Sequence, residues 1–215
     1  MIKLLTDILH DVRVVLDENA ISDALIADAD TDTLTLDEII KSKVLDAVRR
    51  VEIDAPSYLL EGGHHFGDAV YWSRNESFEG VGWTLLPDDF MRLIVFEMTD
   101  WERPVYSAIS TTDPEYERQR SRFKGIRGNV QKPVCAIAIR PEGRVLEFYS
   151  CNDNEAKVCK AVYLPYPSID EYGGIDLCER CYESIVYMTA SLVLSTYGDA
   201  EKSTAMEEQA KNALV

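Results

Sequence analysis

Hydrophobic residues recur at helical spacing in the first quarter of the chain. From residue 2 to residue 17 they form one stripe, with acidic residues on the opposite side, and this pattern is typical of an amphipathic helix. A second helix is predicted to begin after Thr35, because Thr35 and Glu38 have the spacing of a capping box. Its apolar residues keep the helical period until Pro56, where the helix must end. Residues 1–56 are therefore predicted to be helical.

The period changes in the middle of the chain. Short apolar runs alternate there with Gly, Pro, Asn and Asp, which is typical of strands joined by turns. Asp113 and Pro114 predict the start of one helix within Thr111–Phe123, since proline is favoured at the first helical position. Arg140–Arg144 has the composition of a hairpin turn. The strands are predicted at residues 70–72, 82–86, 91–98, 134–139, 144–149 and 160–164.

The last section of the chain, from Gly173 onward, returns to helical spacing. Apolar residues nearly encircle the segment Ile185–Leu194, so this helix must be covered on several sides, either by its own domain or by a neighbouring molecule. Tyr197–Asp199 interrupts the pattern, and a more polar helix is predicted over residues 200–214. The two helices are expected to form a hairpin.

These elements place the chain in the α+β class. We predict a helical N-terminal region (1–56), a small and mostly antiparallel sheet in the middle (66–166, with a helix near 113–123), and a C-terminal helical hairpin (175–214). A chain of 215 residues is long enough for one well-buried domain. Residues 1–215 are therefore interpreted as a single α+β domain.

The overall composition is that of a soluble globular protein, with 46% hydrophobic and 28% charged residues. The longest apolar run, Ile185–Leu194, is about half the length of a bilayer span. Met1–Val15 contains Asp7 and Asp11 and lacks a small-residue cleavage site, so it does not resemble a signal peptide. We expect a protein of the cytosol that does not insert into a membrane.

A cationic stretch interrupts a strongly acidic chain. The net charge of −16 argues against unspecific binding of nucleic acid over the whole surface, because contacts to phosphate need Lys and Arg. Residues 1–100 carry 21 acidic and 8 basic residues, whereas residues 118–132, called here the basic segment, contain no acidic residue. We interpret the basic segment as a docking surface for another protein or for copies of itself; a solvated loop is the alternative. Its basic residues are Arg118, Arg120, Arg122, Lys124, Arg127 and Lys132.

The cysteines are expected to be reduced and mostly buried, as is usual in a cytosolic protein. Cys178 and Cys181 have the spacing of a zinc knuckle, but no second Cys or His pair follows at a usable distance. We predict that both thiols are buried in the core on one face of a helix, while metal binding or a redox role stays open. The five cysteines are Cys135, Cys151, Cys159, Cys178 and Cys181.

Two other segments could hold a metal ion but fit poorly. Asp28–Asp32 begins like a calcium-binding loop, yet Thr33 occupies the glycine position and Ile39 the position of the bidentate glutamate. His64 and His65 follow two glycines, and adjacent side chains point apart in most backbone conformations. We predict an acidic surface loop for the first segment and a flexible loop tip for the second.

No catalytic constellation is evident in the sequence. Nucleophilic catalysis needs a Ser or Cys with a base and an orienting acid, and the chain has only three histidines. The fingerprints of a nucleophile elbow, a phosphate-binding loop and a dinucleotide site are absent. We therefore expect no enzymatic activity and no cofactor.

The order and composition of six segments along the chain form a further pattern. They are Leu86–Leu93, Trp101–Val105, Asp113–Gln119, Lys132–Val134, Cys181–Leu194 and Gly198–Lys202. Their order and composition resemble the head–tail connector proteins of tailed bacteriophages, in particular the adaptor, or tail tubular protein A, class of short-tailed phages. The resemblance spans about residues 35–213.

The resemblance implies a structural virion protein whose copies form a ring, commonly of twelve, at the head–tail junction. Such a ring joins the portal to the tail and extends the DNA channel, and the family has no catalytic residues. The implied partners are further copies of the chain, the portal protein, a downstream tail or ring protein, and double-stranded DNA that passes without specific binding. In similar adaptors terminal segments often reach the portal, which points to Ala200–Val215 here.

Other classes stay open: another phage neck or tail assembly protein, a non-phage interaction module, or a metal-dependent enzyme using His64, His65 or Cys178. A ring also has a physical requirement. Subunits of charge −16 repel one another unless their contacts pair opposite charges or bury apolar surface. The basic segment against an acidic patch such as Asp28–Glu38 is one such pairing.

Overall fold

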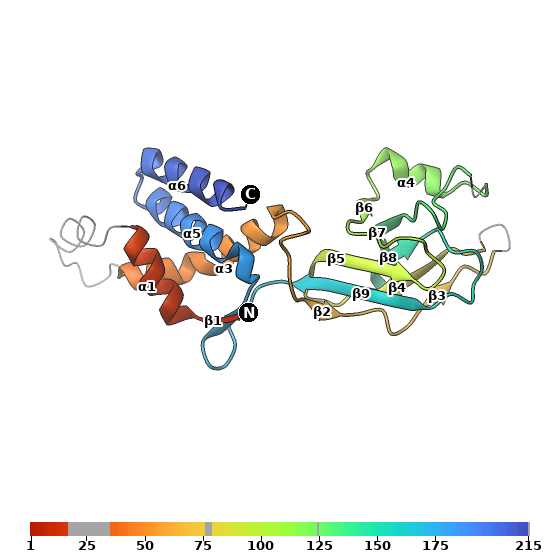
Figure 1. Cartoon of the computed structure of the whole chain (residues 1–215), viewed down its shortest axis with the longest axis horizontal. Helices are drawn as coiled ribbons and strands as arrows, with labels where there is room; N and C mark the ends of the chain where they lie inside the picture. Colours follow the sequence, from red (N-terminus) through yellow and green to blue (C-terminus); the bar gives the residue numbers. More distant parts are fainter. Residues whose placement is uncertain (17–34, 76–78, 124, 215) are drawn as a thin grey trace. The chain divides into compact units, whose positions relative to one another are not determined.

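The chain forms two compact units (Figure 1). The helical unit consists of Met1–Gly62 and Tyr166–Val215, and the β unit of Gly63–Pro165. Five α-helices and mostly antiparallel strands are found among the described residues, so the predicted α+β class is confirmed. The interpretation of residues 1–215 as a single domain stays a prediction. The computed structural model describes residues 1–16, 35–75, 79–123 and 125–214, and Asp28–Asp32 and Lys124 lie outside this range.

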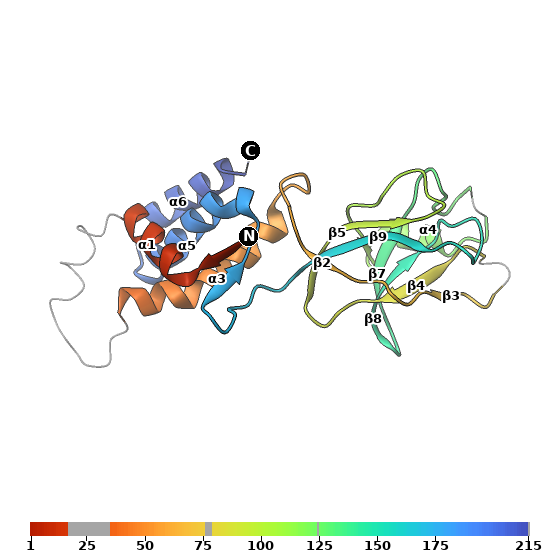
Figure 2. The ribbon, with the colours of Figure 1, turned by 60° about the horizontal axis from the view of Figure 1, so that its bottom comes forward.

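The helical unit is built around α5, which packs against α6, α3 and α1 (Figure 1, Figure 2). The side chains of Ile185, Ala190 and Val193 on α5 are fully buried, so the apolar surface predicted for this helix is covered within its own unit. No helix in the described ranges has both the length and the hydropathy of a membrane span. The helices are α1 (Leu5–Val15), α3 (Leu36–Asp54), the 3-10 turn η2 (Glu179–Cys181), α5 (Tyr182–Thr196) and α6 (Ala200–Asn212).

The capping box predicted at the start of α3 is confirmed. The amide of Glu38 donates to Thr35 Oγ1 at 3.4 Å, and the amide of Thr35 donates to Glu38 Oε2 at 2.8 Å. The bond from the Thr35 amide, together with one from the Thr35 hydroxyl to the same oxygen at 2.8 Å, lowers the pKa of Glu38. The capping box also satisfies two amides that the helix leaves without partners. The helix ends at Asp54, before Pro56, as predicted.

The helix predicted from residue 2 begins later. Ile2–Leu4 forms a strand, β1, that pairs antiparallel with β10 (Gly174–Asp176). The amino group of Met1 extends this pairing, since it donates to Leu177 O at 2.7 Å and to Asp176 Oδ1 at 3.2 Å. Pairing with a strand more than 170 residues away therefore overrides the local helical pattern.

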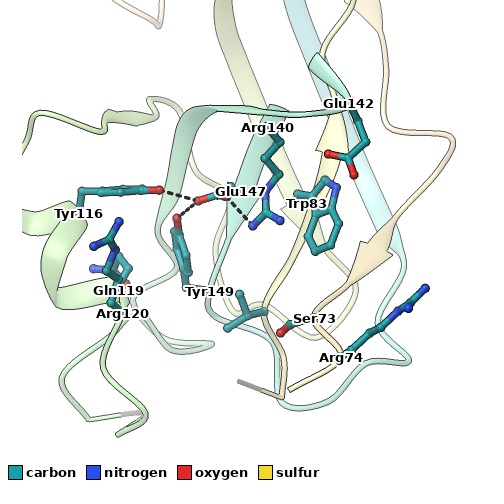
Figure 3. Close-up of a pocket in the computed structure, with 11 residues that line it drawn as sticks. Ser73, Arg74, Trp83, Tyr116, Gln119, Arg120, Arg140, Glu142, Glu147 and Tyr149 are labelled. Carbon is teal, nitrogen blue, oxygen red and sulfur yellow. Dashed lines mark hydrogen bonds and ion pairs between the residues drawn. The ribbon is translucent and has the colours of Figure 1, made fainter. Parts of the chain in front are cut away.

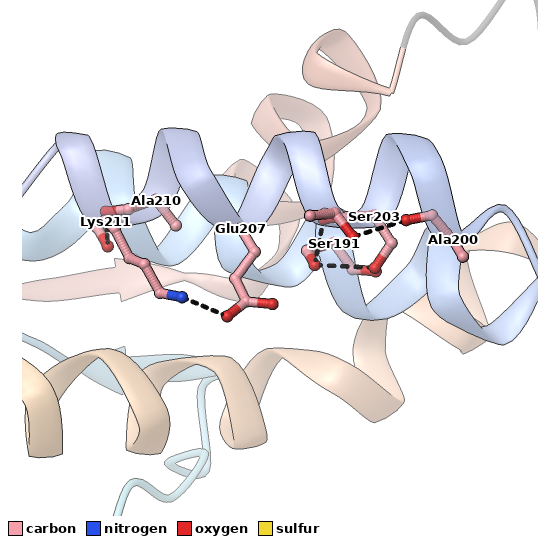
Figure 4. A network of polar contacts seen from close by, with 8 residues as sticks. Ser191, Ala200, Ser203, Glu207, Ala210 and Lys211 are labelled. Atoms are coloured by element: carbon pink, nitrogen blue, oxygen red, sulfur yellow. Dashed lines mark hydrogen bonds and ion pairs between the residues drawn. The ribbon is translucent and has the colours of Figure 1, made fainter.

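The C-terminal helices form the predicted hairpin, and two serines join them (Figure 4). Ser191 Oγ donates to Ser203 O at 2.8 Å, and Ser203 Oγ donates to Ser191 O at 2.9 Å. Gly198 has a φ of 81° between the helices, a left-handed conformation that favours glycine. Asp199 then caps α6 by accepting a hydrogen bond from the amide of Lys202 at 3.1 Å.

The β unit consists of two sheets, one of three strands in the order β2-β9-β5 and one of five in the order β3-β4-β8-β7-β6. Figure 2 shows β5 and β9 in one layer and β4, β7 and β8 in the other. Within the described part, β6 and β7 pair parallel and the other neighbours antiparallel. The strands are β2 (His64–His65), β3 (Tyr71–Trp72), β4 (Gly82–Leu85), β5 (Phe90–Met98), β6 (Ile109–Ser110), β7 (Cys135–Arg140), β8 (Gly143–Phe148) and β9 (Val158–Pro165).

An aromatic core joins the two sheets. Phe96 of β5 stacks on Phe148 of β8, with the ring centroids 5.7 Å apart. Phe90 of β5 stacks on Tyr163 of β9 at 5.5 Å, and Trp101 meets Phe96 edge-on at 5.7 Å. Such pairs add about 0.5–1.5 kcal/mol each beyond the burial of their area. The core thereby fixes which side chains of β8 point away from it.

Two predictions in the β unit need correction. His64 and His65, predicted as a flexible loop tip, form the edge strand β2, which pairs with Val162 and Tyr163 of β9. The helix predicted within Thr111–Phe123 is shorter: α4 spans Pro114–Gln119. Its start is as predicted, since Asp113 Oδ1 accepts a hydrogen bond from the amide of Glu115 at 2.8 Å. Its end differs because Gln119 turns inward and binds the loop that follows.

Candidate interaction site

A polar pocket lies on the face of the five-stranded sheet that points away from the aromatic core (Figure 3). Leu146 and Phe148 belong to the core, so the alternating residues Glu147 and Tyr149 face the other side. Helix α4 lies on that side, and its Tyr116 points toward Glu147. Strand alternation and one short helix thus produce the pocket.

Glu147 is a buried carboxylate with a full set of partners. It is 6% exposed, and its Oε1 accepts from Arg140 Nε at 2.7 Å and pairs with Arg140 Nη2 at 2.6 Å. Its Oε2 accepts from the hydroxyls of Tyr116, at 3.0 Å, and Tyr149. Burial, aided by this carboxylate, raises the pKa of both tyrosines. With these four hydrogen-bond donors, Glu147 acts as an anchor and not as a free base.

Arg140 is held by stacking as well as by charge. Its guanidinium carbon lies 3.9 Å from the ring centroid of Trp83, and Trp83 stacks on Tyr71 at 6.0 Å. The two aromatic residues are neighbours across β3 and β4, and Trp83 is the register partner of Glu147. A cation over an indole ring contributes about 0.5–2 kcal/mol. The end of β7 is therefore fixed to the middle of the sheet.

The pocket has a volume of about 720 Å³, within the range of sites that hold a small ligand or a group of inserted side chains. Three guanidinium groups, the carboxylates of Glu142 and Glu147 and the flat face of Trp83 line it. Because Arg140 is bound to Glu147, the donors that the pocket offers to an anionic or planar group come from Arg74 and Arg120. No His or Cys of the described residues lines it. The lining residues are Ser73, Arg74, Val81, Trp83, Tyr116, Gln119, Arg120, Arg140, Glu142, Glu147 and Tyr149.

The basic segment leads away from this pocket and is held by buried polar side chains. Gln119 is 1% exposed; its Nε2 donates to Glu115 O at 3.2 Å, and its Oε1 accepts from the amide of Gly128 at 2.8 Å. Arg127 is 3% exposed and donates to Glu79 O at 2.7 Å. Burial lowers the pKa of Arg127. These contacts hold Gln119, Arg127 and Gly128 of the segment against the β unit.

The predicted interaction residues fall into three groups. Arg118 and Arg120 are exposed and form i,i+3 ion pairs with Glu115 and Glu117 at 3.6 and 3.3 Å, which stabilise little at a surface. Arg122 and Lys132 form the second group and are exposed. The guanidinium carbon of Arg122 lies 5.1 Å from the ring centroid of Phe123.

Arg127 forms the third group. Because its side chain is buried, it supports the loop and does not contribute charge to a docking surface.

Two exposed hydrophobic side chains accompany these arginines. Phe123 is 58% exposed and Ile126 is 56% exposed. They belong to the same loop as Arg122, so cationic and apolar surface coincide there. We call Arg122, Phe123 and Ile126 the loop patch. A combination of apolar and cationic groups at the surface is typical of a protein-binding surface.

The other sequence candidates do not form a metal site among the described residues. His64 and His65 are exposed on β2, and within the described ranges no three His, Cys, Asp or Glu side chains are placed to hold a metal ion. Cys178 and Cys181 are buried, as predicted, but Cys178 precedes the 3-10 turn η2 and only the chain after Cys181 is α-helical.

The sequence analysis missed the pocket. One signal was available: Glu147 is the only acidic residue in the apolar run Val145–Tyr149, and a charge there needs a buried partner. The partner, Arg140, and the helix that brings Tyr116 could not be inferred from spacing alone. No protein-family model matches the chain, and no curated protein is significantly similar to it.

Proposed function

We propose that the protein is a structural virion component, the connector ring between the portal and the tail of a tailed phage. Twelve copies would form the ring, which extends the DNA channel and carries the next tail protein. The ring lets double-stranded DNA pass without binding it specifically. The chain performs no catalysis in this role.

The observation that carries the proposal is the sequence resemblance over residues 35–213. Several residues of the resembling segments are buried in the core. Leu86, Phe90, Leu93 and Trp101 are 7%, 0%, 3% and 6% exposed and belong to the core of the β unit. A resemblance at buried positions concerns the fold and supports the proposed role by analogy.

The loop patch supports an assembly role. It places a cation and two apolar side chains on the surface of a chain with a net charge of −16. Copies of such a chain repel one another unless a cationic surface of one meets an acidic surface of the next or the contact buries apolar surface. The adjoining pocket, with its arginines, offers further donors to an acidic segment of a neighbouring copy.

The test is native mass spectrometry combined with negative-stain electron microscopy. The protein is analysed alone and after mixing with the portal protein encoded nearest to it. A closed ring of defined copy number on the portal is the expected result. A chain that stays monomeric and does not bind the portal would contradict the proposal.

A charge-reversal variant tests whether the basic segment forms the contact between neighbouring copies. Arg120→Glu with Arg122→Glu is expected to prevent ring formation while leaving the circular dichroism spectrum unchanged. The matched control is Lys157→Glu with Lys160→Glu, which changes the charge equally at two exposed positions of the same unit. If both double variants assemble like the parent, the basic segment is not the contact.

A further inference from the structure

Two cysteines and a glutamate form a buried cluster in the helical unit. Cys178 and Cys181 are 1% and 0% exposed, and Glu52 of α3 is 3% exposed. The amide of Cys178 donates to Glu52 Oε1 at 2.9 Å. This cluster lies outside the basic segment and the pocket, and the connector function makes no use of it.

The backbone brings the two thiols within reach of each other. The amide of Cys181 donates to Cys178 O at 3.1 Å, which closes a turn of the i to i+3 type. Such a turn holds its end Cα atoms less than about 7 Å apart, and a disulfide spans Cα distances of about 4.4–6.8 Å. The side chains also contact, since the Cys181 thiol is a hydrogen-bond partner of Cys178. The pair can therefore close without a large backbone change.

The surroundings of Cys178 favour its thiolate. The Cys181 thiol, aided by backbone amides of Glu61, Cys181 and Arg180, lowers the pKa of Cys178 to about 6, against the effect of burial. The protonated thiol has a partner too, because Cys178 Sγ donates to Leu59 O at 2.9 Å. Only the protonated thiol can make this hydrogen bond, which must break when the thiolate, the nucleophile in disulfide exchange, forms.

Glu52 supplies a proton acceptor close to the pair. Burial raises its pKa to about 7, while the hydrogen bond from the Cys178 amide opposes this rise. Nearby charges also act on Glu52: the Cys178 thiolate and Asp176 of β10 raise its pKa, and the amino group of Met1 lowers it. A carboxyl group of this kind gains and loses a proton near neutral pH.

A short turn covers the cysteines. Residues 56–61, called here the strap, lie against Cys178 through the contact of its Sγ with Leu59 O. Arg180, between the two cysteines, holds the strap: it pairs with Glu61 at 2.7 Å and donates to Tyr58 O at 3.4 Å. Both side chains of this ion pair are about half exposed, and such surface pairs stabilise little. The ion pair therefore adds little to the attachment of the strap, which is also held by the buried side chain of Leu60 and by the contact of Leu59 O with Cys178.

We propose that Cys178 and Cys181 are a redox-active dithiol, shielded by the strap, that exchanges with a low-molecular-weight disulfide such as oxidised glutathione. The Cys178 thiolate attacks one sulfur of oxidised glutathione, forms a mixed disulfide and releases one glutathione thiolate. Cys181 then gives its proton to the Glu52 carboxylate and attacks Cys178 Sγ. This closes the protein disulfide and releases the second glutathione thiolate. The protein loses two electrons, and oxidised glutathione gains them.

The test uses the full-length chain with Cys159→Ser, because Cys159 is exposed and would react by itself. Cys135 and Cys151 are buried in the β unit, and burial raises the pKa of both thiols. After incubation with oxidised glutathione, intact mass and peptide mapping are expected to show the loss of two hydrogens at a Cys178–Cys181 disulfide. With Cys181→Ser, a glutathione adduct on Cys178 is expected to accumulate instead.

The rate of the reaction with oxidised glutathione tests whether the strap shields the two cysteines. Arg180→Gln is expected to speed the reaction about two- to fivefold, as the loss of one surface ion pair allows. The matched control is Lys202→Gln, which removes the exposed Lys202–Asp199 pair on α6 and should leave the rate unchanged. Equal rates in both variants would overturn the role of the strap. A folded chain that stays fully reduced, even with Arg180→Gln, while the urea-unfolded chain forms the disulfide, would overturn the dithiol itself.

Discussion

Replacing Glu52 with glutamine tests whether burial of this carboxyl group makes the helical unit sensitive to pH. Glu52 is 3% exposed on α3 and accepts a hydrogen bond from the Cys178 amide at 2.9 Å. Burial raises its pKa from 4.5 to about 7. Glutamine keeps the carbonyl acceptor and a hydrogen-bond donor but cannot ionise, so Glu52→Gln mimics the protonated state.

The sign of the effect follows from proton binding. In the unfolded chain Glu52 ionises around 4.5, whereas in the folded protein it keeps its proton up to about 7. The folded state therefore binds more protons in this window, and the free energy of unfolding falls as the pH rises through it. At about 1.4 kcal/mol per pH unit, the difference amounts to about 3 kcal/mol. Glu52→Gln should remove this loss, so its stability relative to the parent should rise by about 3 kcal/mol from pH 4.5 to pH 8.

Urea unfolding under reducing conditions measures both units separately. The far-ultraviolet circular dichroism signal at 222 nm reports mainly on the helical unit, while tryptophan fluorescence reports on the β unit, since Trp72, Trp83 and Trp101 all lie there. The fluorescence transition serves as the internal control and should not change. If parent and variant lose helical stability in parallel between pH 4.5 and pH 8, the reasoning about Glu52 is wrong.

Three further substitutions test other parts of the structure by urea unfolding. Phe148→Ala, at the centre of the aromatic core, should destabilise the β unit by about 3–5 kcal/mol, seen by tryptophan fluorescence. Arg140→Ala leaves the carboxylate of Glu147 buried without its cation and should cost about 3 kcal/mol by the same signal, whereas Arg140→Lys should restore part of the loss. Ser191→Ala removes the hydrogen bonds that the Ser191 hydroxyl makes to Ser203 between α5 and α6 and should lower the stability of the helical unit by about 1–2 kcal/mol, measured at 222 nm; no change would mean that these two hydrogen bonds do not stabilise the hairpin.

The sequence predicted those elements that depend on interactions between residues a few positions apart. The capping box of Thr35 and Glu38 and the start of α4 at Asp113 and Pro114 are examples, because cap and capped amide are neighbours in the chain. The hairpin turn before Gly143 is another, since a φ of 131° there suits glycine. Such features need no knowledge of the tertiary structure.

Features made by distant segments could not be predicted in this way. Ile2–Leu4 fits a helical stripe equally well, and only its pairing with β10 selects a strand. Glu147 and Tyr116 are 31 positions apart, and Cys178 and Glu52 are 126 positions apart. The pocket and the dithiol cluster can therefore be recognised only from the tertiary contacts, although Glu147 of the pocket is an unusual charge in an apolar run.

The discontinuous helical unit has a consequence for synthesis on the ribosome. The β unit is contiguous, and its ends are close, because His64 pairs with Tyr163. It can fold as soon as it leaves the exit tunnel. Helices α1 and α3, by contrast, are made first but must wait for α5, the last helix but one, to cover side chains such as Ile8 and Val44. A nascent chain stalled before α5 thus exposes these apolar faces, which makes the two early helices the part of the chain that most needs a chaperone.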